Sequence, residues 1–246
     1  MSDLLVVLPI LSEAIAAPCI DSIRAEGSSF GIPPSEVVIV DNTRHGIDRD
    51  RVGDFAYYRD PDGHNLGVAR SWNVGAQAVM ERGLDYLVIL SASMLFGPEL
   101  HITWREQMDR HWGSLVIENT GNSWHLIAIH ADAFRAAGLF DSNFYPGYFE
   151  AVDWHLRLIR SGECERARNG TIWPNLWVNA MSRGVAMHAP FVDTPPDPLL
   201  AYYAAKWGGA KGEEKFDLPW GDKPLDHFED VPIPVLAERY GLSVWW

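Results

Sequence analysis

The stretch Glu36-Val37-Val38-Ile39-Val40-Asp41-Asn42 decides the fold class of this chain, because a continuous apolar run ends there in two polar side chains. Such a run is typical of a strand that is buried on both faces of a sheet. Further apolar runs predict strands at residues 4–8 and 86–90, and a short strand is expected at 55–58. Helical spacing of apolar residues predicts helices at about 12–26 and 68–82, each followed by a glycine.

The order of these elements predicts an α/β fold with a mainly parallel central sheet flanked by helices. Sheets of this kind bind ligands in the crevice beyond the carboxyl ends of their strands. The polar residues at those ends are Asp41 and Asn42 after the second expected strand, and Ser91-Ala92-Ser93 after the strand at 86–90. We therefore expect the functional site at this edge of the sheet.

The second half of the chain is less regular, with a strand expected at 126–129 and helices at 131–137 and 149–160. In the helix at 149–160, Val152, Leu156 and Ile159 are predicted to form the buried stripe. A polar stripe of Glu150, Asp153 and Arg157 is expected on the opposite side. Beyond Pro190 the chain is rich in Pro, Gly and charged residues, with short helices expected near 199–206 and 235–240, and is interpreted as an irregular C-terminal tail that wraps the domain as a lid.

The composition narrows the class of protein further. A net charge of −13 argues against non-specific DNA binding. The two cysteines provide neither a disulfide framework nor metal-ligand spacing, which favours a reducing, cytoplasmic location. No apolar run approaches the roughly 20 residues of a transmembrane helix. The 11 tryptophans offer flat apolar faces for stacking on sugars or bases, although packing in the core is an equal interpretation.

Four segments, in this order, resemble glycosyltransferases of family 2, which have the Rossmann-like GT-A fold and are common in bacteria and phages. They are Val37–Asn42, Asn65-Leu66-Gly67-Val68-Ala69-Arg70-Ser71-Trp72-Asn73, Gly138-Leu139-Phe140-Asp141 with Phe149-Glu150-Ala151-Val152-Asp153, and Tyr202-Tyr203-Ala204-Ala205-Lys206-Trp207-Gly208-Gly209. The resemblance implies transfer of a sugar, with inversion, from a UDP-, GDP- or dTDP-linked donor to a glycan, protein or lipid-linked acceptor. It also implies a GT-A domain at 1–190, with a nucleotide-binding half at 1–97 and an acceptor-side half at 98–190, followed by an extension at 191–246.

The resemblance assigns roles to individual residues. Asp41 is expected to accept a hydrogen bond from the nucleotide base, and Arg70 to bind phosphate or base oxygens through its planar guanidinium. The remaining expected donor-binding residues are Asn65, Gly67, Asn73, Ser91, Ser93, His188 and Lys206. Trp124, Trp154 and Trp207 are the candidate stacking platforms for the acceptor.

Two positions depart from the family pattern. Ser91-Ala92-Ser93 stands where the family has an acidic pair that binds Mg²⁺ or Mn²⁺, and neutral hydroxyls are weak ligands for such ions. Transfer is therefore either metal-independent, with His188 and Lys206 at the diphosphate, or uses a metal held by His188 and Asp153. Ala151 replaces the expected general base, which leaves Glu150 and Asp153 as candidates.

These departures also support a second hypothesis, a catalytically impaired domain that binds a nucleotide, sugar or partner without turnover. A nucleotidyltransferase is disfavoured, because residues 8–13 are not a Gly-rich basic loop.

Overall fold

The computed structural model describes residues 4–30, 34–94, 113, 115–118, 126–163 and 197–244. Its centre is a six-stranded sheet in the order β3-β2-β1-β4-β6-β5. The strands are β1 (Leu4–Ile10), β2 (Val37–Asp41), β3 (Ala56–Tyr58), β4 (Tyr86–Leu90), β5 (Val116–Glu118) and β6 (Leu126–His130). The helices are α1 (Glu13–Phe30), α2 (Arg49–Val52), α3 (Gly67–Arg82), α5 (Ala131–Ala137), α6 (Glu150–Arg160), α8 (Asp197–Trp207) and α9 (Ile233–Arg239), with short 3₁₀ turns at η1 (Pro34–Glu36) and η4 (Pro219–Gly221).

The sheet is mixed, which refines the expectation of a mainly parallel one. Strands β3, β2, β1 and β4 run parallel, whereas β6 runs antiparallel to both β4 and β5. The expected α/β class is confirmed, and all five strands expected from the sequence are present. Strand β5 is the one strand here that the sequence did not predict.

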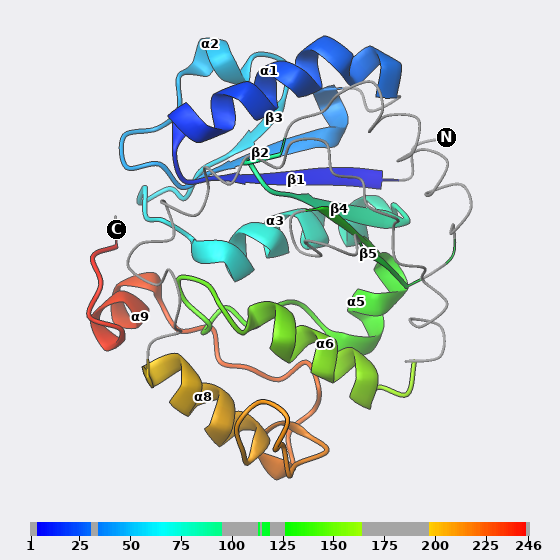
Figure 1. Ribbon diagram of the computed structural model, residues 1–246, viewed down its shortest axis with the longest axis vertical. Coiled ribbons are helices and arrows are strands. Elements are labelled where there is room, and N and C mark those ends of the chain that lie inside the picture. The colour runs from blue at the N-terminus through cyan, green and yellow to red at the C-terminus, as the bar shows by residue number, and fades with distance from the viewer. Residues whose placement is uncertain are drawn as a thin grey trace.

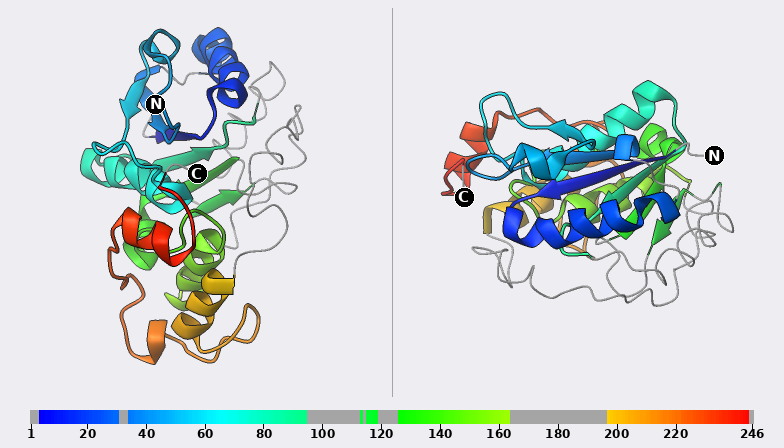
Figure 2. Two further views of the ribbon diagram at one scale, coloured as in Figure 1. Left: turned by 90° about the vertical axis from the view of Figure 1, so that its left-hand side faces the viewer. Right: turned by 90° about the horizontal axis from the view of Figure 1, so that it is seen from above.

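Successive side chains of β1 are buried on opposite faces of the sheet, as the two-residue period of a strand requires. Leu5 and Val7 belong to the core cluster under α3, and Val6 and Leu8 to the cluster under α1. Figures 1 and 2 show α1 on one face and α3, α5 and α6 on the other, with α8 outside α6. Helix α3 lies close to the sheet at Gly75, where an added Cβ would come within 2.8 Å of Val7.

Helix α6 is oriented opposite to the prediction, so the assignment of its buried stripe was wrong. Its charged residues Glu150, Asp153 and Arg157 are buried, whereas Ile159 is 48% exposed. Trp154 and Leu158, both fully buried, supply the apolar contact instead. The periodicity misled because Asp153 and Arg157 are paired with each other inside the protein and Asp153 also binds Lys206 of α8, which a pattern of apolar spacing does not record.

The C-terminal tail is part of the main core. Tyr203 and Trp207 of α8 and Leu236 of α9 are buried in the same cluster as the residues under α3. Figures 1 and 2 place α9 and the end of the chain on the side where the parallel strands end. There the backbone N–H of Asn65 donates to the carbonyl of Val244 over 3.0 Å.

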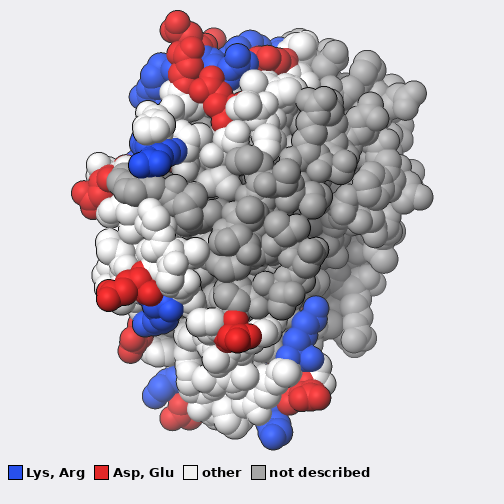
Figure 3. Space-filling view, turned by 60° about the vertical axis from the view of Figure 1, so that its left-hand side comes forward, with Lys and Arg blue, Asp and Glu red and all other residues white. Residues whose placement is uncertain are grey.

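Two observations concern membrane-spanning helices and surface charge. Within the described segments, no helix is long and apolar enough to cross a membrane. On the face drawn in Figure 3, acidic and basic side chains alternate, and the described residues there form no continuous basic surface.

Candidate functional site

The sheet order has a reversal point at the carboxyl edge of the parallel strands. Strands β2 and β3 lie on one side of β1 and β4 lies on the other, so the order of the strands reverses between β1 and β4. Ligands of open α/β sheets bind at such a reversal point. Ser91 and Ser93 follow β4 at this place, partly exposed, with their hydroxyl oxygens 2.9 Å apart. The two serines therefore lie at the expected edge of the sheet, and their hydroxyls are chemically able to bind a ribose or phosphate.

Asp41, at the end of β2, is a fully buried carboxylate whose partners all belong to this chain. One oxygen accepts from the backbone N–H and the hydroxyl of Thr43. The other accepts from the N–H of Ile47, the hydroxyl of Tyr57 over 2.6 Å and the guanidinium of Arg59 over 2.9 Å.

A carboxylate offers about four lone-pair positions, so these five donors saturate Asp41. Burial would raise the pKa of Asp41, but the hydrogen bonds from Thr43 and Tyr57 hold it below its usual value. Asp41 therefore differs from the free base acceptor that the sequence predicted. It positions Tyr57 and Arg59, and no motif in the sequence pointed to either residue.

The start of α3 is capped from within the chain. The N–H of Gly67 donates to Oδ1 of Asn65, and the N–H of Val68 donates to the carbonyl of Pro146 over 2.7 Å. Gly67 has a φ of 73°, and an added Cβ would lie 2.8 Å from the Pro146 carbonyl oxygen. Asn65 and Gly67 thus shape the start of α3, and two of the N–H groups that a helix N-terminus offers to an anion are already satisfied within the chain.

Two further residues of the same motif bind parts of the chain. The side-chain amide of Asn73 exchanges two hydrogen bonds with the backbone of Phe140, at 2.8 and 2.9 Å. The guanidinium of Arg70 lies 2.8 Å from the carboxylate of Asp230 and donates to the carbonyl of Val231. Asn73 thus joins α3 to the turn before Asp141, and Arg70 holds the C-terminal segment over the start of α3.

A network of four buried charges lies beneath α8. The ammonium of Lys206 is 2.8 Å from both Asp141 and Asp153, and Arg157 donates to Asp153 over 2.9 Å. None of these four side chains is exposed. Burial alone would raise the pKa of Asp153, but the charges of Lys206 and Arg157 hold it below its usual range. Two carboxylates and two cations compensate one another, as burial of charge requires.

This network corrects several expected roles. Lys206 is neutralised by two carboxylates and closed to solvent, so it does not serve as a free cation for a diphosphate. Asp153 has no oxygen left for a metal, because Lys206, Arg157 and the indole N–H of Trp207 occupy both. Trp154 and Trp207 are fully buried and offer no stacking face. Trp124 and His188 lie outside the described residues.

Glu150 is the one predicted carboxylate in these segments that is buried without a compensating cation. It is 6% exposed, and its Oε2 has no hydrogen-bond partner. Burial, and to a smaller extent the charge of Asp153, raises the pKa of Glu150 to about 7. It begins α6 directly after Tyr148 and Phe149, whose φ angles of 77° and 70° are strained for side chains of this size. Backbone strain of this kind often accompanies a functional site.

The described residues also contain one group with the spacing of metal ligands, which the sequence analysis missed. Ligand atoms of Asp60, Asp62 and His64 lie within 4.8 Å of one another in the loop between β3 and α3. The same Asp60 oxygen accepts the backbone N–H groups of Asp62 and His64. These bonds close a turn before α3, and that turn explains the cluster without an ion.

No protein-family model and no curated protein matches the chain. The fold and the site define an α/β protein with a mixed six-stranded sheet flanked by helices. Its carboxyl edge carries paired serines, and a buried, unpaired glutamate opens helix α6.

Proposed function

We propose that this chain is a glycosyltransferase with a GT-A fold, similar to family 2, that moves a sugar from a nucleotide-sugar donor to an acceptor with inversion. Three observations support the proposal. The strand order has its reversal point beside Ser91 and Ser93. The segment from Asn65 to Asn73 begins α3, and its Asn73 holds the backbone of Phe140, directly before Asp141. A buried carboxylate with a raised pKa then opens the acceptor-side helix.

Glu150 carries the proposal, because a general base needs a carboxylate that is unpaired and has a pKa near the working pH. Its Oε2 has no donor in the described part of the chain, and its pKa is about 7. In the proposed step, the acceptor oxygen forms a bond to the anomeric carbon while the bond from that carbon to the phosphate oxygen breaks. The acceptor proton passes to Glu150, and the nucleoside diphosphate leaves with the bonding electrons.

The leaving diphosphate needs positive charge or hydrogen-bond donors nearby. The described residues do not fit a divalent cation at the family position, since Ser91 and Ser93 are neutral and Asp153 is saturated. Arg70 is the predicted donor-site cation that keeps partial exposure, at 19% of its side chain. We therefore assign diphosphate contact to Arg70, after its release from Asp230, and ribose or phosphate hydrogen bonds to Ser91 and Ser93.

A second candidate function is a binding domain without turnover. It is favoured by the engagement of Asp41, Asn73 and Lys206 in contacts within the chain, which leaves few of the expected donor-site groups free. Such a domain would bind a nucleotide or sugar at the same edge of the sheet. Turnover, and not binding, separates it from the transferase.

The experiment that tests the proposal is a thermal-shift panel with UDP, GDP, dTDP and CDP, each with Mn²⁺ and with EDTA. A nucleotide at about 100 times its Kd stabilises the folded state by roughly 2.7 kcal/mol, a shift of a few degrees for a domain of this size. The sugar conjugates of the stabilising nucleotide are then assayed for release of nucleoside diphosphate.

Wild type and Glu150→Gln form the matched pair in that assay. A nucleotide shift in both, with turnover in the wild type alone, supports the transferase. A shift without turnover in either favours the binding domain. No shift with any nucleotide contradicts the transferase and leaves, of the second candidate, only a domain that binds sugar.

A further inference from the structure

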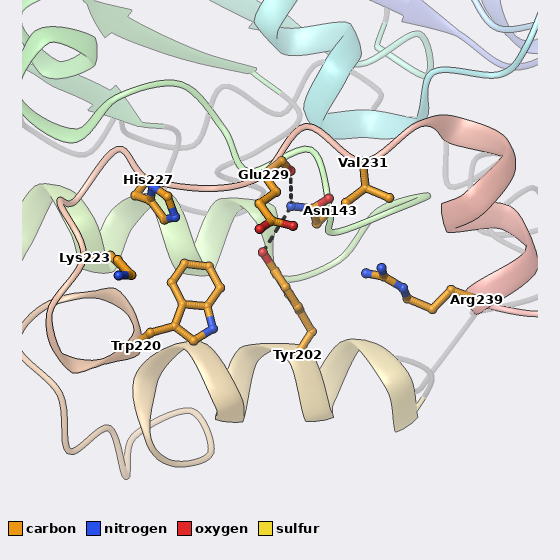
Figure 4. Close-up of a pocket in the computed structure, with 8 residues that line it drawn as sticks. All are labelled: Asn143, Tyr202, Trp220, Lys223, His227, Glu229, Val231 and Arg239. Atoms are coloured by element: carbon orange, nitrogen blue, oxygen red, sulfur yellow. Dashed lines mark hydrogen bonds between the residues drawn. The ribbon is translucent and has the colours of Figure 1, made fainter.

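A cavity of about 320 Å³ lies between α8, η4 and the segment that leads into α9. Figure 4 shows Tyr202 entering it from α8 and Arg239 from α9, with Asn143 beside Glu229 in the middle. Trp220, Lys223 and His227 gather at the other end. The volume is at the lower limit of the roughly 300–1,000 Å³ of small-molecule sites. The cavity therefore fits a ligand of about one ring.

The wall of the cavity contains an unsatisfied acceptor. Asn143 is 2% exposed, and its Nδ2 donates to the hydroxyl of Tyr202 and to the carbonyl of Glu229. Its Oδ1 is buried and finds no donor in the segments that the structure describes. A buried acceptor without a partner costs free energy, which a hydroxyl or N–H of a ligand recovers. The site thus calls for a ligand that donates hydrogen bonds.

Trp220 supplies an aromatic wall in an unusual backbone conformation. Its φ of 53° and ψ of 18° lie in the left-handed region, which bulky side chains rarely adopt. The half-buried indole lies edge-on to Tyr202 and His227, with ring centres 6.1 and 5.9 Å apart. Such strain persists only where the surroundings impose it. An indole in a cavity wall suits the apolar C–H face of a sugar ring.

The lining carries charged groups of both signs. Glu229 brings a carboxylate, and Lys223 and Arg239 bring cations. A simple cation would be repelled by Lys223 and Arg239, and a simple anion by Glu229. A neutral polyhydroxylated ring carries no net charge, and its hydroxyls both donate and accept, so it can pair with the carboxylate, the amide oxygen and the cations at once.

We propose that this cavity is a binding site for a single sugar residue, with its C–H face on Trp220 and its hydroxyls on Asn143 and Glu229. The floor is rigid, because the Tyr202 hydroxyl donates to Asp141 over 2.8 Å and so belongs to the buried charge network. Sugar binding here stands independently of transfer. The assignment of this sugar as a residue of a glycan acceptor rests on the proposed function.

The test is saturation-transfer difference NMR on the full chain with methyl glycosides of glucose, galactose, mannose and N-acetylglucosamine, and with inorganic phosphate as a competitor. We expect at least one glycoside to bind, with the strongest transfer to the protons of one ring face, and phosphate not to displace it. Trp220→Asn should weaken its binding by about tenfold or more, since Asn tolerates the left-handed backbone but removes the ring.

Leu218→Asn is the matched control, because Leu218 is exposed in the same loop and does not line the cavity. It should bind as the wild type does, and a thermal midpoint for each variant verifies folding. Absence of binding by every glycoside, equal binding by Trp220→Asn, or displacement by phosphate overturns the sugar site. If the wild type binds a glycoside but releases no nucleoside diphosphate from any nucleotide-sugar, the transferase is refuted and this sugar site stands.

Discussion

The ammonium of Lys206 lies 2.8 Å from Oδ1 of Asp153, and neither side chain is exposed to solvent. The pair connects α8, near the end of the chain, to α6 in its middle. Asp141 and Arg157 complete the network from the turn before α6 and from α6 itself. A helix that the sequence analysis assigned to a lid is thereby fastened to the core by charge as well as by apolar packing.

Replacement of Lys206 by Met should strongly destabilise the protein. The substitution leaves Asp141 and Asp153 buried with one fewer cation, and removing one partner of a buried ion pair costs about 3–5 kcal/mol. Urea unfolding followed by tryptophan fluorescence measures this loss. Lys215→Met, at an exposed position, is the matched control and should unfold near the wild-type midpoint. Equal midpoints for the two variants would contradict the structural role of Lys206.

The strands and helices that bury a regular set of apolar residues could be predicted from the sequence. The strands at 4–8, 37–42 and 86–90 and the helix at 68–82 are all present, because each buries a regular set of apolar residues. The same reasoning failed for α6, since its buried face contains Asp153 and Arg157. Besides pairing with Arg157, Asp153 binds Lys206, which is 53 residues further along the chain, and local spacing carries no information about such a pair.

The locations of the candidate residues followed from the sequence more than their contacts did. Asp41 and Ser91 lie at the carboxyl edge of the sheet, as expected from the strands that precede them. It did not indicate that Tyr57 and Arg59 saturate Asp41, because these residues come from a neighbouring strand and its loop. The assignment of Glu150 as the catalytic carboxylate remains a prediction, now supported by its burial and its unpaired oxygen.

Glu150 should make stability decrease as the pH rises from about 5 to 7. The pKa of Glu150 is about 7 in the folded state, against an ordinary value of 4.5 that applies to the unfolded chain. Between these two pH values the folded state therefore binds more protons than the unfolded state. Stability then falls with rising pH, by up to about 1.4 kcal/mol per pH unit. Glu150→Gln removes this dependence and should be more stable than the wild type at pH 8 but not at pH 4.

Denaturant midpoints across that pH range measure the effect. Glu163→Gln, a change outside the buried network, provides the comparison for loss of one negative charge. Parallel pH profiles of wild type and Glu150→Gln would show that the pKa of Glu150 is not raised.

The same substitution tests the chemistry. If Glu150 is the base, Glu150→Gln should lower turnover by about 10²–10⁴ while nucleotide affinity stays nearly unchanged. Turnover of the wild type should rise with pH to a plateau, with a midpoint near the Glu150 pKa of about 7. Full turnover in the variant would remove Glu150 from the proposed step.

Asn73 should prove to be a structural residue and not a donor contact. In Asn73→Asp, the group that donates to the Phe140 carbonyl becomes a carboxylate oxygen, which repels that carbonyl. We expect a loss of about 1–3 kcal/mol in the free energy of unfolding. Nucleotide affinity, measured by calorimetry below the unfolding transition, should not change. A variant of wild-type stability that binds nucleotide more weakly would instead place Asn73 at the donor.

Arg70 has two roles to be separated, the observed contact with Asp230 and the proposed contact with the diphosphate. Arg70→Ala should weaken nucleotide binding by roughly 1.5–3 kcal/mol, the value of a hydrogen bond to a charged group. Asp230→Asn breaks the same ion pair but keeps the guanidinium, so nucleotide binding should be as tight as in the wild type or tighter. Calorimetric titration of both variants with the stabilising nucleotide makes the comparison. If the two substitutions weaken binding equally, Arg70 acts only by holding the C-terminal segment in place, and the diphosphate must be bound by other groups.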